Sequence, residues 1–208
     1  MARTRSEQYP EIQRNILKVA AEVFARVGYA TSSISDLALA ANLSRGALYH
    51  YFPSKEAILS SILEQHVTEF LCKVDAAMQT SRIPVEQLSA VTKAIVEFNS
   101  SCPDEQMILL NELNQLSDSE REKIASLERL ILDRLSDLLI KVDSKGKITP
   151  LNKRIYTMMF LGIVNYTFAW YNPNGRVGPA EFADLADDIF LNGLLSPQVT
   201  TRSASASK

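Results

Sequence analysis

Residues 44–50 carry side chains that are suited to contacting nucleic acid. A hydroxyl, a guanidinium, a phenol and an imidazole lie within one short segment, and all can hydrogen-bond to base edges or phosphate oxygens. The set comprises Ser44, Arg45, Ala47, Tyr49 and His50. These residue types indicate contact with a DNA groove, provided that the backbone presents them on one outward face.

Two short helical patterns joined by a tight turn could present that face. Ser33 followed by Asp36 resembles a capping box, which would start the first helix at the next residue. The apolar residues Ile34, Leu37, Ala38 and Ala41 then fall on one side of it. Asn42 is predicted to turn the chain, since Asn tolerates the left-handed conformation. Ser44 caps a second helix from Arg45 to about Tyr51. This is the pattern of a helix-turn-helix.

Leu48 and Phe52 are the expected core anchors of the second helix. A plain pair of helices in an all-helical core would show a similar pattern, so the motif taken alone leaves both interpretations open. Its position favours DNA contact, because it follows an amphipathic helix predicted from Pro10 to Val27. Arg3 and Arg5 precede that helix and form either an arm that reaches DNA or an untethered solubilising tail.

Residues 28–59 read GYATSSISDLALAANLSRGALYHYFPSKEAIL, and this run resembles the DNA-binding domain of TetR-family transcriptional regulators. The resemblance covers about 50 residues and matches nearly every defining position of the family pattern. It implies that Tyr49 and Lys55 grip phosphates while Arg45, Gly46 and Ala47 face the groove. Ser33 and Ser44 are expected to position the backbone. Asn42 replaces a common Gly, and Ala47 replaces a common Thr, which suggests a different base preference.

Composition agrees with a globular chain that meets a polyanion at one end. The chain has 208 residues, 46% of them hydrophobic, and a net charge of −2. Residues 1–60 hold seven Lys/Arg and five Asp/Glu, a net of +2, so the remainder carries −4. Cys72 and Cys102 lack metal-ligand spacing, and the N-terminus lacks the apolar core of a signal peptide. A cytoplasmic protein without a cofactor is the expectation.

Helical periodicity dominates the rest of the chain, so the predicted fold class is all-α. Further helices are predicted over 55–79, 84–99, 103–116 and 116–142. The predicted domains are a helix-turn-helix domain over 1–54, an effector-binding and dimerisation domain over 55–195, and a disordered tail over 196–208. The long helix from Lys55 begins near the proposed DNA and ends deep in the second domain, so it is placed to couple the two.

The segment 155–171 contains no charged residue. A membrane span needs about 20 apolar residues, and this stretch is shorter and holds Asn165, so a span is disfavoured. A helix that is apolar all round must be buried on most sides, which favours a partner subunit. With a second helix predicted from Pro179 to Leu195, two chains would form a four-helix interface. The resemblance points to the same homodimer.

The same apolar segment could also line a cavity for a small-molecule effector. Phe70, Met107, Tyr166 and Trp170 are the candidate ligand-binding residues, although core packing is favoured for each one singly. WYNPNG at 170–175 is similar to the ending found in TetR-family members that sense acyl-CoA thioesters. A helix stop at the dimer edge remains the favoured role for Pro173 and Gly175.

Two other functions were weighed against DNA binding. An enzyme is disfavoured because the sequence shows no Gly-rich phosphate loop, metal-ligand cluster or nucleophile elbow. His66 is predicted to be a partly exposed helix residue, and the adjacent Asp187 and Asp188 point to different faces. A helical protein-interaction module is the second alternative. The sequence favours a DNA-binding regulator, most simply a repressor released from a palindromic operator by an effector.

Overall fold

The computed structural model describes residues 4–195, which contain only helices, turns and loops. The predicted tail and the predicted arm residue Arg3 lie outside this range, whereas Arg5 belongs to the first helix. The α-helices are α1 (Thr4–Val27), α2 (Ile34–Ala40), α3 (Arg45–Tyr51), α4 (Lys55–Met78), α5 (Pro84–Ser101), α6 (Pro103–Glu112), α7 (Asp118–Val142), α8 (Lys153–Val164) and α9 (Pro179–Leu195), with 3-10 turns at Leu113–Gln115 and Asn165–Ala169. The all-α prediction is confirmed.

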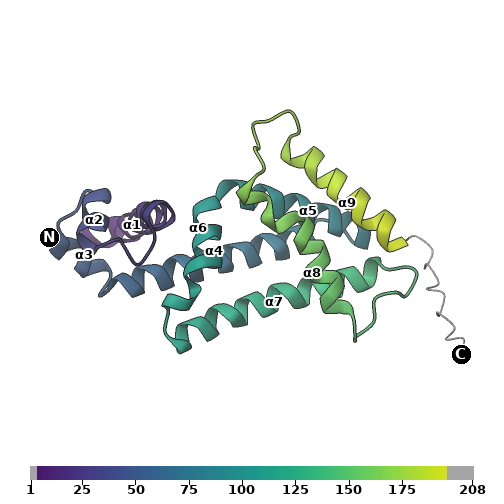
Figure 1. Ribbon diagram of the computed structural model, residues 1–208, viewed down its shortest axis with the longest axis horizontal. Helices are drawn as coiled ribbons and strands as arrows, with labels where there is room; N and C mark the ends of the chain where they lie inside the picture. Colours follow the sequence, from purple (N-terminus) through teal and green to yellow (C-terminus); the bar gives the residue numbers. More distant parts are fainter. Residues whose placement is uncertain (1–3, 196–208) are drawn as a thin grey trace, which may run out of the picture.

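The first three helices form a small unit at one end of an elongated molecule (Figure 1). Its core consists of Ile16, Ala20 and Phe24 of α1 together with Leu37 of α2 and Leu48 of α3, all at most 1% exposed. Helix α1 begins at Thr4, six residues before the predicted start at Pro10, so this proline lies inside the helix. Because α1 supplies most of this core, it holds α2 and α3 in place.

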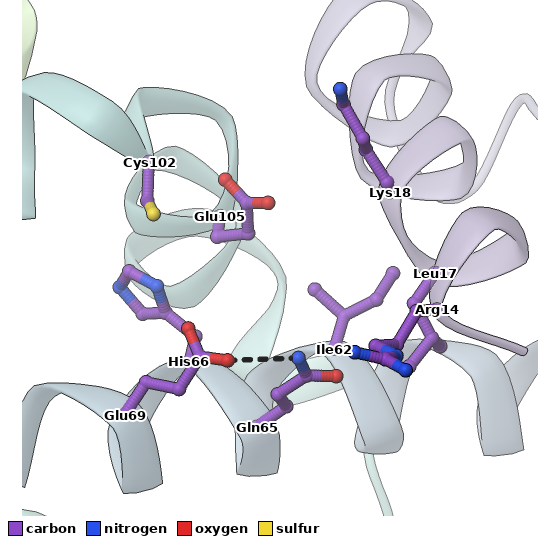
Figure 2. Close-up of a pocket in the computed structure, with 9 residues that line it drawn as sticks. All are labelled: Arg14, Leu17, Lys18, Ile62, Gln65, His66, Glu69, Cys102 and Glu105. Atoms are coloured by element: carbon purple, nitrogen blue, oxygen red, sulfur yellow. Dashed lines mark hydrogen bonds between the residues drawn. The ribbon is translucent and has the colours of Figure 1, made fainter. Parts of the chain in front are cut away.

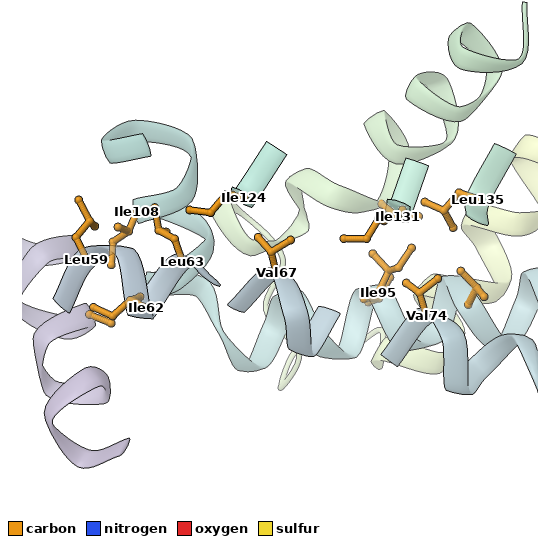
Figure 3. Packing of buried hydrophobic residues seen from close by; sticks show 14 of the residues in the cluster. Leu59, Ile62, Leu63, Val67, Val74, Ile95, Ile108, Ile124, Ile131 and Leu135 are labelled. Carbon is orange, nitrogen blue, oxygen red and sulfur yellow. The ribbon is translucent and has the colours of Figure 1, made fainter. Parts of the chain in front are cut away.

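Helix α4 leaves this unit and runs through the rest of the molecule (Figure 1). Its apolar residues are buried along its whole length: Leu59 and Leu63 lie near Ile108 of α6, Ile62 lies on the side of α1, and Val67 and Val74 lie towards Ile131 and Leu135 of α7 (Figure 3). Burial of a Leu or Ile side chain contributes about 1.5–3 kcal/mol each. Helix α4 is therefore packed against other helices both near its start and near its end, as its predicted coupling role requires.

The remaining helices pack around α4, with α6 beside its first half (Figure 1). Helix α5 lies between α4 and α9, and α7 lies between α4 and α8. Two buried polar pairs join these layers, since Thr92 of α5 contacts Asp187 of α9, and Ser136 of α7 lies 2.8 Å from Thr157 of α8. Polar groups buried in this way are stabilising only when paired, so each pair favours one specific register between its helices.

The apolar segment 155–171 is not one continuous helix. Helix α8 ends at Val164, and a 3-10 turn follows. The buried amide of Asn99 donates to the carbonyls of Val164 and Asn165, each at 3.2 Å, and the Thr167 hydroxyl donates to Val164 O at 2.8 Å. These contacts satisfy carbonyls that would otherwise continue the helix.

Large apolar side chains of α8 and α9 remain exposed in the single chain. Ile155, Met158 and Met159 of α8 are 52–59% exposed, and Leu185 and Ile189 of α9 are 51% and 66% exposed. One chain alone therefore leaves the segment exposed on one side, as expected if a partner subunit buries it. Apolar patches of this kind mark interaction surfaces.

Candidate DNA-binding surface and ligand cavity

Helix α2 begins at the predicted capping box. Ser33 Oγ accepts from the amide of Asp36 at 3.2 Å, and the Asp36 carboxylate accepts from the amide of Ser33 at 2.8 Å. The Ser33 hydroxyl also donates to that carboxylate, and these hydrogen bonds from Ser33 lower the pKa of Asp36. The Ser33 hydroxyl is thus engaged in starting the helix.

The turn between α2 and α3 has the predicted left-handed residue. Asn42 has a φ of 55°, a conformation that few residues other than Gly adopt without strain. The amide of Leu43 then donates to the carbonyl of Ala38 at 2.8 Å, which closes the turn. Ser44 caps α3 by accepting from the amide of Ala47 at 3.1 Å. Each predicted local signal in this motif is confirmed.

Helix α3 is held by a buried apolar side and presents its polar side outward. Leu48 is fully buried and Phe52 is 3% exposed, whereas Tyr49 is 46% exposed. Arg45 and His50 are also exposed, and within the described residues Arg45 takes part in no ion pair. The His50 ring lies edge-on to Tyr51 at a centroid distance of 5.7 Å.

Among the described residues, no neighbour of Gly46 requires a glycine at this position. A Cβ placed there would meet no heavy atom within 4 Å among the described residues, and the backbone needs no positive φ. Glycine inside a helix is destabilising by roughly 0.5–1 kcal/mol relative to Ala. A bare backbone at this exposed point instead permits another molecule to approach α3 closely.

Lys55 is placed differently from the other candidate DNA contacts. Its ammonium donates to the carbonyls of Tyr29 and Ser32, at 2.6 Å and 2.8 Å. It also lies 4.2 Å from the centre of the Tyr29 ring. Two of its three donors thus hold the α1–α2 connection against the start of α4.

A shallow cleft lies where α1 meets α4 and α6 (Figure 2). Arg14, Leu17 and Lys18 of α1 line one side, and α4 lines the floor, where Gln65 donates to Glu69 at 3.0 Å. Glu105 lies at the start of α6 on the far side, and burial raises its pKa. At about 90 Å³ the cleft is too small for most ligands.

A larger cavity of about 250 Å³ lies deeper in the helical domain, and we call it the central cavity. It is enclosed by α4, α6, α7 and α8. Its lining is mostly apolar and includes Val67, Phe70, Leu109, Leu110, Ile131, Leu132, Met158 and Leu161; the polar members are His66, Gln106, Glu128, Arg154 and Asn165. An apolar cavity with a few polar groups is typical of a small-molecule site.

The polar residues of the central cavity lie at different depths. His66 and Gln106 are 4% and 6% exposed, and His66 Nε2 lies 2.8 Å from Gln106 Oε1. Burial lowers the pKa of His66, so the ring is neutral at neutral pH. Arg154 is exposed, and Glu128 is half-buried with a pKa raised by burial. The closed end of the cavity therefore holds a neutral polar pair, and its mouth holds the charges.

Only Phe70, among the four predicted ligand-binding residues, lines the central cavity. Met107 points to a separate space of about 70 Å³ beside Phe24 and Gly28. Tyr166 and Trp170 are 60% and 63% exposed, and the Trp170 ring packs against Phe182 at 5.7 Å. Tyr166 and Trp170 follow the break after Val164, which the sequence analysis did not predict, whereas Met107 lies on α6 and borders a different space.

Sequence reasoning missed the polar residues of the cavity. His66 was expected to be partly exposed, and its burial corrects that expectation. It lies four residues after Ile62 and four before Phe70, on the apolar side of α4, which was a usable signal. Gln106, Glu128 and Arg154 offered no such signal, because only the packing of three separate helices brings them together.

Two further observations concern the part of the chain that the structure describes. Across residues 4–195, each helix is too short or too polar to cross a membrane. The His, Cys, Asp and Glu side chains in that range do not gather into a group that could hold a metal ion.

Comparison with known proteins gives the family. Residues 16–62 match the model described as bacterial regulatory proteins of the tetR family, and residues 81–194 match the tetracyclin repressor-like C-terminal domain. The fatty acid metabolism regulator protein of Bacillus subtilis (strain 168) is 27% identical over 164 residues, covering 77% of this chain and 84% of that protein.

Solved structures agree over nearly the whole chain. A TetR-family transcriptional regulator from Bordetella parapertussis 12822 superposes with a TM-score of 0.81 at 31% identity, covering 89% of this chain and 98% of that one. AibR, solved in complex with isovaleryl coenzyme A and operator DNA, superposes with a TM-score of 0.73 at 25% identity, covering 90% and 100%. Because the matched models include the helix-turn-helix and more than half of the chain, this protein belongs to the TetR family of bacterial regulatory proteins.

Proposed function

We propose that this protein is a cytoplasmic, homodimeric transcriptional repressor that leaves a palindromic operator when a hydrophobic effector binds. The observation that carries the proposal is the polar face of α3, which is anchored from behind by Leu48 and on which Arg45, Tyr49 and His50 are exposed among the described residues. Residues 1–54 form the DNA-binding domain, and residues 55–195 form the effector-binding and dimerisation domain.

Each exposed residue of α3 has a role in this proposal. Arg45 contacts a base, preferring guanine if both guanidinium nitrogens are used. Gly46 and Ala47 let the backbone come close to the groove, and Tyr49 and His50 extend towards phosphates. Ser33 and Ser44 act by holding the ends of α2 and α3. Lys55 has one donor left for a phosphate and otherwise positions the α1–α2 connection.

A second copy of the chain covers the exposed apolar side chains of α8 and α9. The pair of helices from each copy forms a four-helix interface, and two-fold symmetry then presents α3 twice. Successive major grooves on one face of DNA lie about 34–36 Å apart. The two copies of α3 should have this separation in the DNA-bound state.

The central cavity is the proposed effector site. AibR was solved with an acyl-CoA thioester, which supports the same class of effector for this chain. Helix α6 links the site to the DNA-binding domain, because it carries Gln106 in the cavity and Glu112 near its end, where Glu112 Oε1 accepts from the amide of Tyr29 at 3.2 Å. An effector shifts the equilibrium between the DNA-binding state and the released state only by the difference between its affinities for these two states. We propose no catalytic activity.

The test is binding to DNA selected from a random duplex library by the full-length protein. The selected sequence should be a pseudo-palindrome, bound by a dimer, with an affinity that falls steeply with salt as phosphate contacts release counterions. A monomer in solution that selects no common sequence would overturn the proposal, and it would favour the protein-interaction alternative.

A further inference from the structure

The inner end of the central cavity carries a hydrogen-bond donor with no acceptor. Gln106 is buried, with 6% of its surface exposed. Its amide oxygen lies 2.8 Å from His66 Nε2. Among the described residues, its amide nitrogen has no hydrogen-bond acceptor. Two side-chain atoms within that range are both fully enclosed and unpaired, Asn99 Oδ1 and Asp187 Oδ2. The unpaired Gln106 nitrogen is not one of them, so it keeps some accessible surface, and Gln106 lines the central cavity.

The Gln106 amide is held in one orientation by its neighbours. The Gln106 oxygen can only accept, so His66 Nε2 donates to it in the neutral tautomer that carries its proton on Nε2, and burial favours a neutral ring by lowering its pKa. The same ring packs against Phe98 at a centroid distance of 5.0 Å, and Phe98 packs against Phe70 at 5.3 Å. Because the oxygen is fixed, the NH₂ group is directed away from His66.

An occupant of this end must supply an acceptor. A ligand that fills the inner end excludes water from the amide, and a buried donor left unpaired costs about tenfold or more in affinity. A site built around a buried hydrogen-bonding group rejects analogues that lack the matching group more strongly than an apolar pocket rejects a missing methylene. Gln106 is therefore placed to select the ligand.

The mouth of the cavity favours an anion on one side only. Arg154 is exposed there, and within the described residues it has no ion-pair partner. On the α7 side lies the half-buried carboxyl group of Glu128, which repels an anion when it is ionised. The guanidinium of Arg154 matches carboxylate and phosphate geometry. The middle of the cavity, between these ends, is apolar.

We propose that the effector is an elongated, mostly hydrocarbon molecule with a carbonyl oxygen at its buried end, read by Gln106, and an anionic group at its exposed end, read by Arg154. The anion is a carboxylate or the phosphates of a coenzyme A thioester. This inference rests on the proposed role of the central cavity as the effector site. It differs from a plain fatty acyl chain, whose terminal methyl would leave the buried amide unpaired.

The probes are medium-length straight-chain carboxylic acids and their counterparts with a ketone on the carbon before the last. Calorimetry on the full-length protein without DNA should show that the keto acid binds about tenfold more tightly than the matched plain acid. Gln106→Leu should abolish this preference while the plain acid still binds. Gln106→Glu, which keeps an oxygen for His66 but loses the donors, should abolish it as well.

Control variants separate selection from general damage. Asn111→Leu makes the same chemical change on α6 outside the central cavity and should keep the preference. Arg154→Met should weaken both acids by a similar factor, about fivefold for an exposed charge pair, and should leave the methyl esters unaffected. Lys153→Met is the neighbouring control. The coenzyme A thioester of the keto acid is a further probe. If it binds more tightly than the free keto acid, the anion is assigned to the phosphates, and the reverse result assigns it to a carboxylate.

Three results would overturn the proposal. The first is equal affinity for keto and plain acids, the second is a preference that survives Gln106→Leu, and the third is no binding of any member of the series. Operator release is measured separately. A keto acid that binds selectively but leaves the operator complex intact would count against the repressor mechanism and not against this ligand class.

Discussion

The ammonium of Lys55 donates to the carbonyl of Tyr29 at 2.6 Å, across the junction between the α1–α2 connection and the start of α4. It lies over the ring of the same Tyr29 and donates to Ser32 as well. The amide of Tyr29 in turn donates to Glu112 of α6. One residue of the DNA-binding domain is therefore held by α4 on one side and by α6 on the other.

Replacing Lys55 should therefore disturb the domain as well as any phosphate contact. Lys55→Met removes two hydrogen bonds to a charged group, and the loss should lower the free energy of unfolding by about 2 kcal/mol. Thermal unfolding measures this change, with the exposed Lys18→Met as the control. DNA affinity should fall equally for the operator and for unrelated duplexes. An unchanged melting temperature would mean that the Lys55 contacts contribute nothing to stability.

Arg45 and Tyr49 should differ in what they contribute to DNA binding. Arg45→Ala should relax the preference at particular base pairs at a cost of about 1–3 kcal/mol for the operator. Tyr49→Phe should weaken all duplexes alike, because a phosphate contact carries no sequence information. Titration of the operator and single-base variants by fluorescence anisotropy separates the two. If Arg45→Ala preserved both affinity and base preference, α3 would not be the reading helix.

Glu112 should transmit effector binding to the DNA-binding domain. Glu112→Ala removes the acceptor for the Tyr29 amide without touching the central cavity. Effector affinity without DNA should stay the same, while the effector concentration needed to release the operator should rise severalfold, as expected for a coupling energy of about 1 kcal/mol. Asn111→Ala, one position earlier, is the matched control. Equal release by wild type and Glu112→Ala would exclude this contact from the coupling.

Asp187 should make stability depend on pH. Burial raises its pKa, and within the described residues its Oδ2 has no partner while Oδ1 contacts the Thr92 hydroxyl. Because the folded carboxyl has the higher pKa, the folded state binds more protons between the two pKa values. The free energy of unfolding therefore falls as pH rises from about 3.9, the unfolded value.

Asp187→Asn should remove that fall with pH, because it keeps the shape of the side chain without the charge. The variant should be more stable than wild type at about pH 7 and lose this advantage near pH 4. Denaturant unfolding at several pH values measures the difference, and the neighbouring exposed Asp188→Asn is the control. A pH profile identical to that of wild type would show that Asp187 is not the titrating group.

The local structure of the candidate DNA-binding surface could be predicted almost entirely from the sequence, because its determinants are local. The Ser33 and Asp36 capping box, the left-handed Asn42 and the Ser44 cap each depend on residues within about four positions of one another. Local hydrogen bonds and backbone preferences decide such features before any tertiary packing. The spacing of Leu48 and Phe52 then determined which side of α3 faces outward.

The ligand cavity was decided by the tertiary structure. Gln106 lies on α6, Glu128 on α7 and Arg154 on α8, and no periodicity within one helix indicates that these three line one space. The break after Val164 has a similar cause, since it depends on the amide of Asn99, 65 residues away. Cavities form where helices distant in sequence fail to close completely. Their shape depends on the packing of all of them together, whereas a helix cap depends only on its own turn.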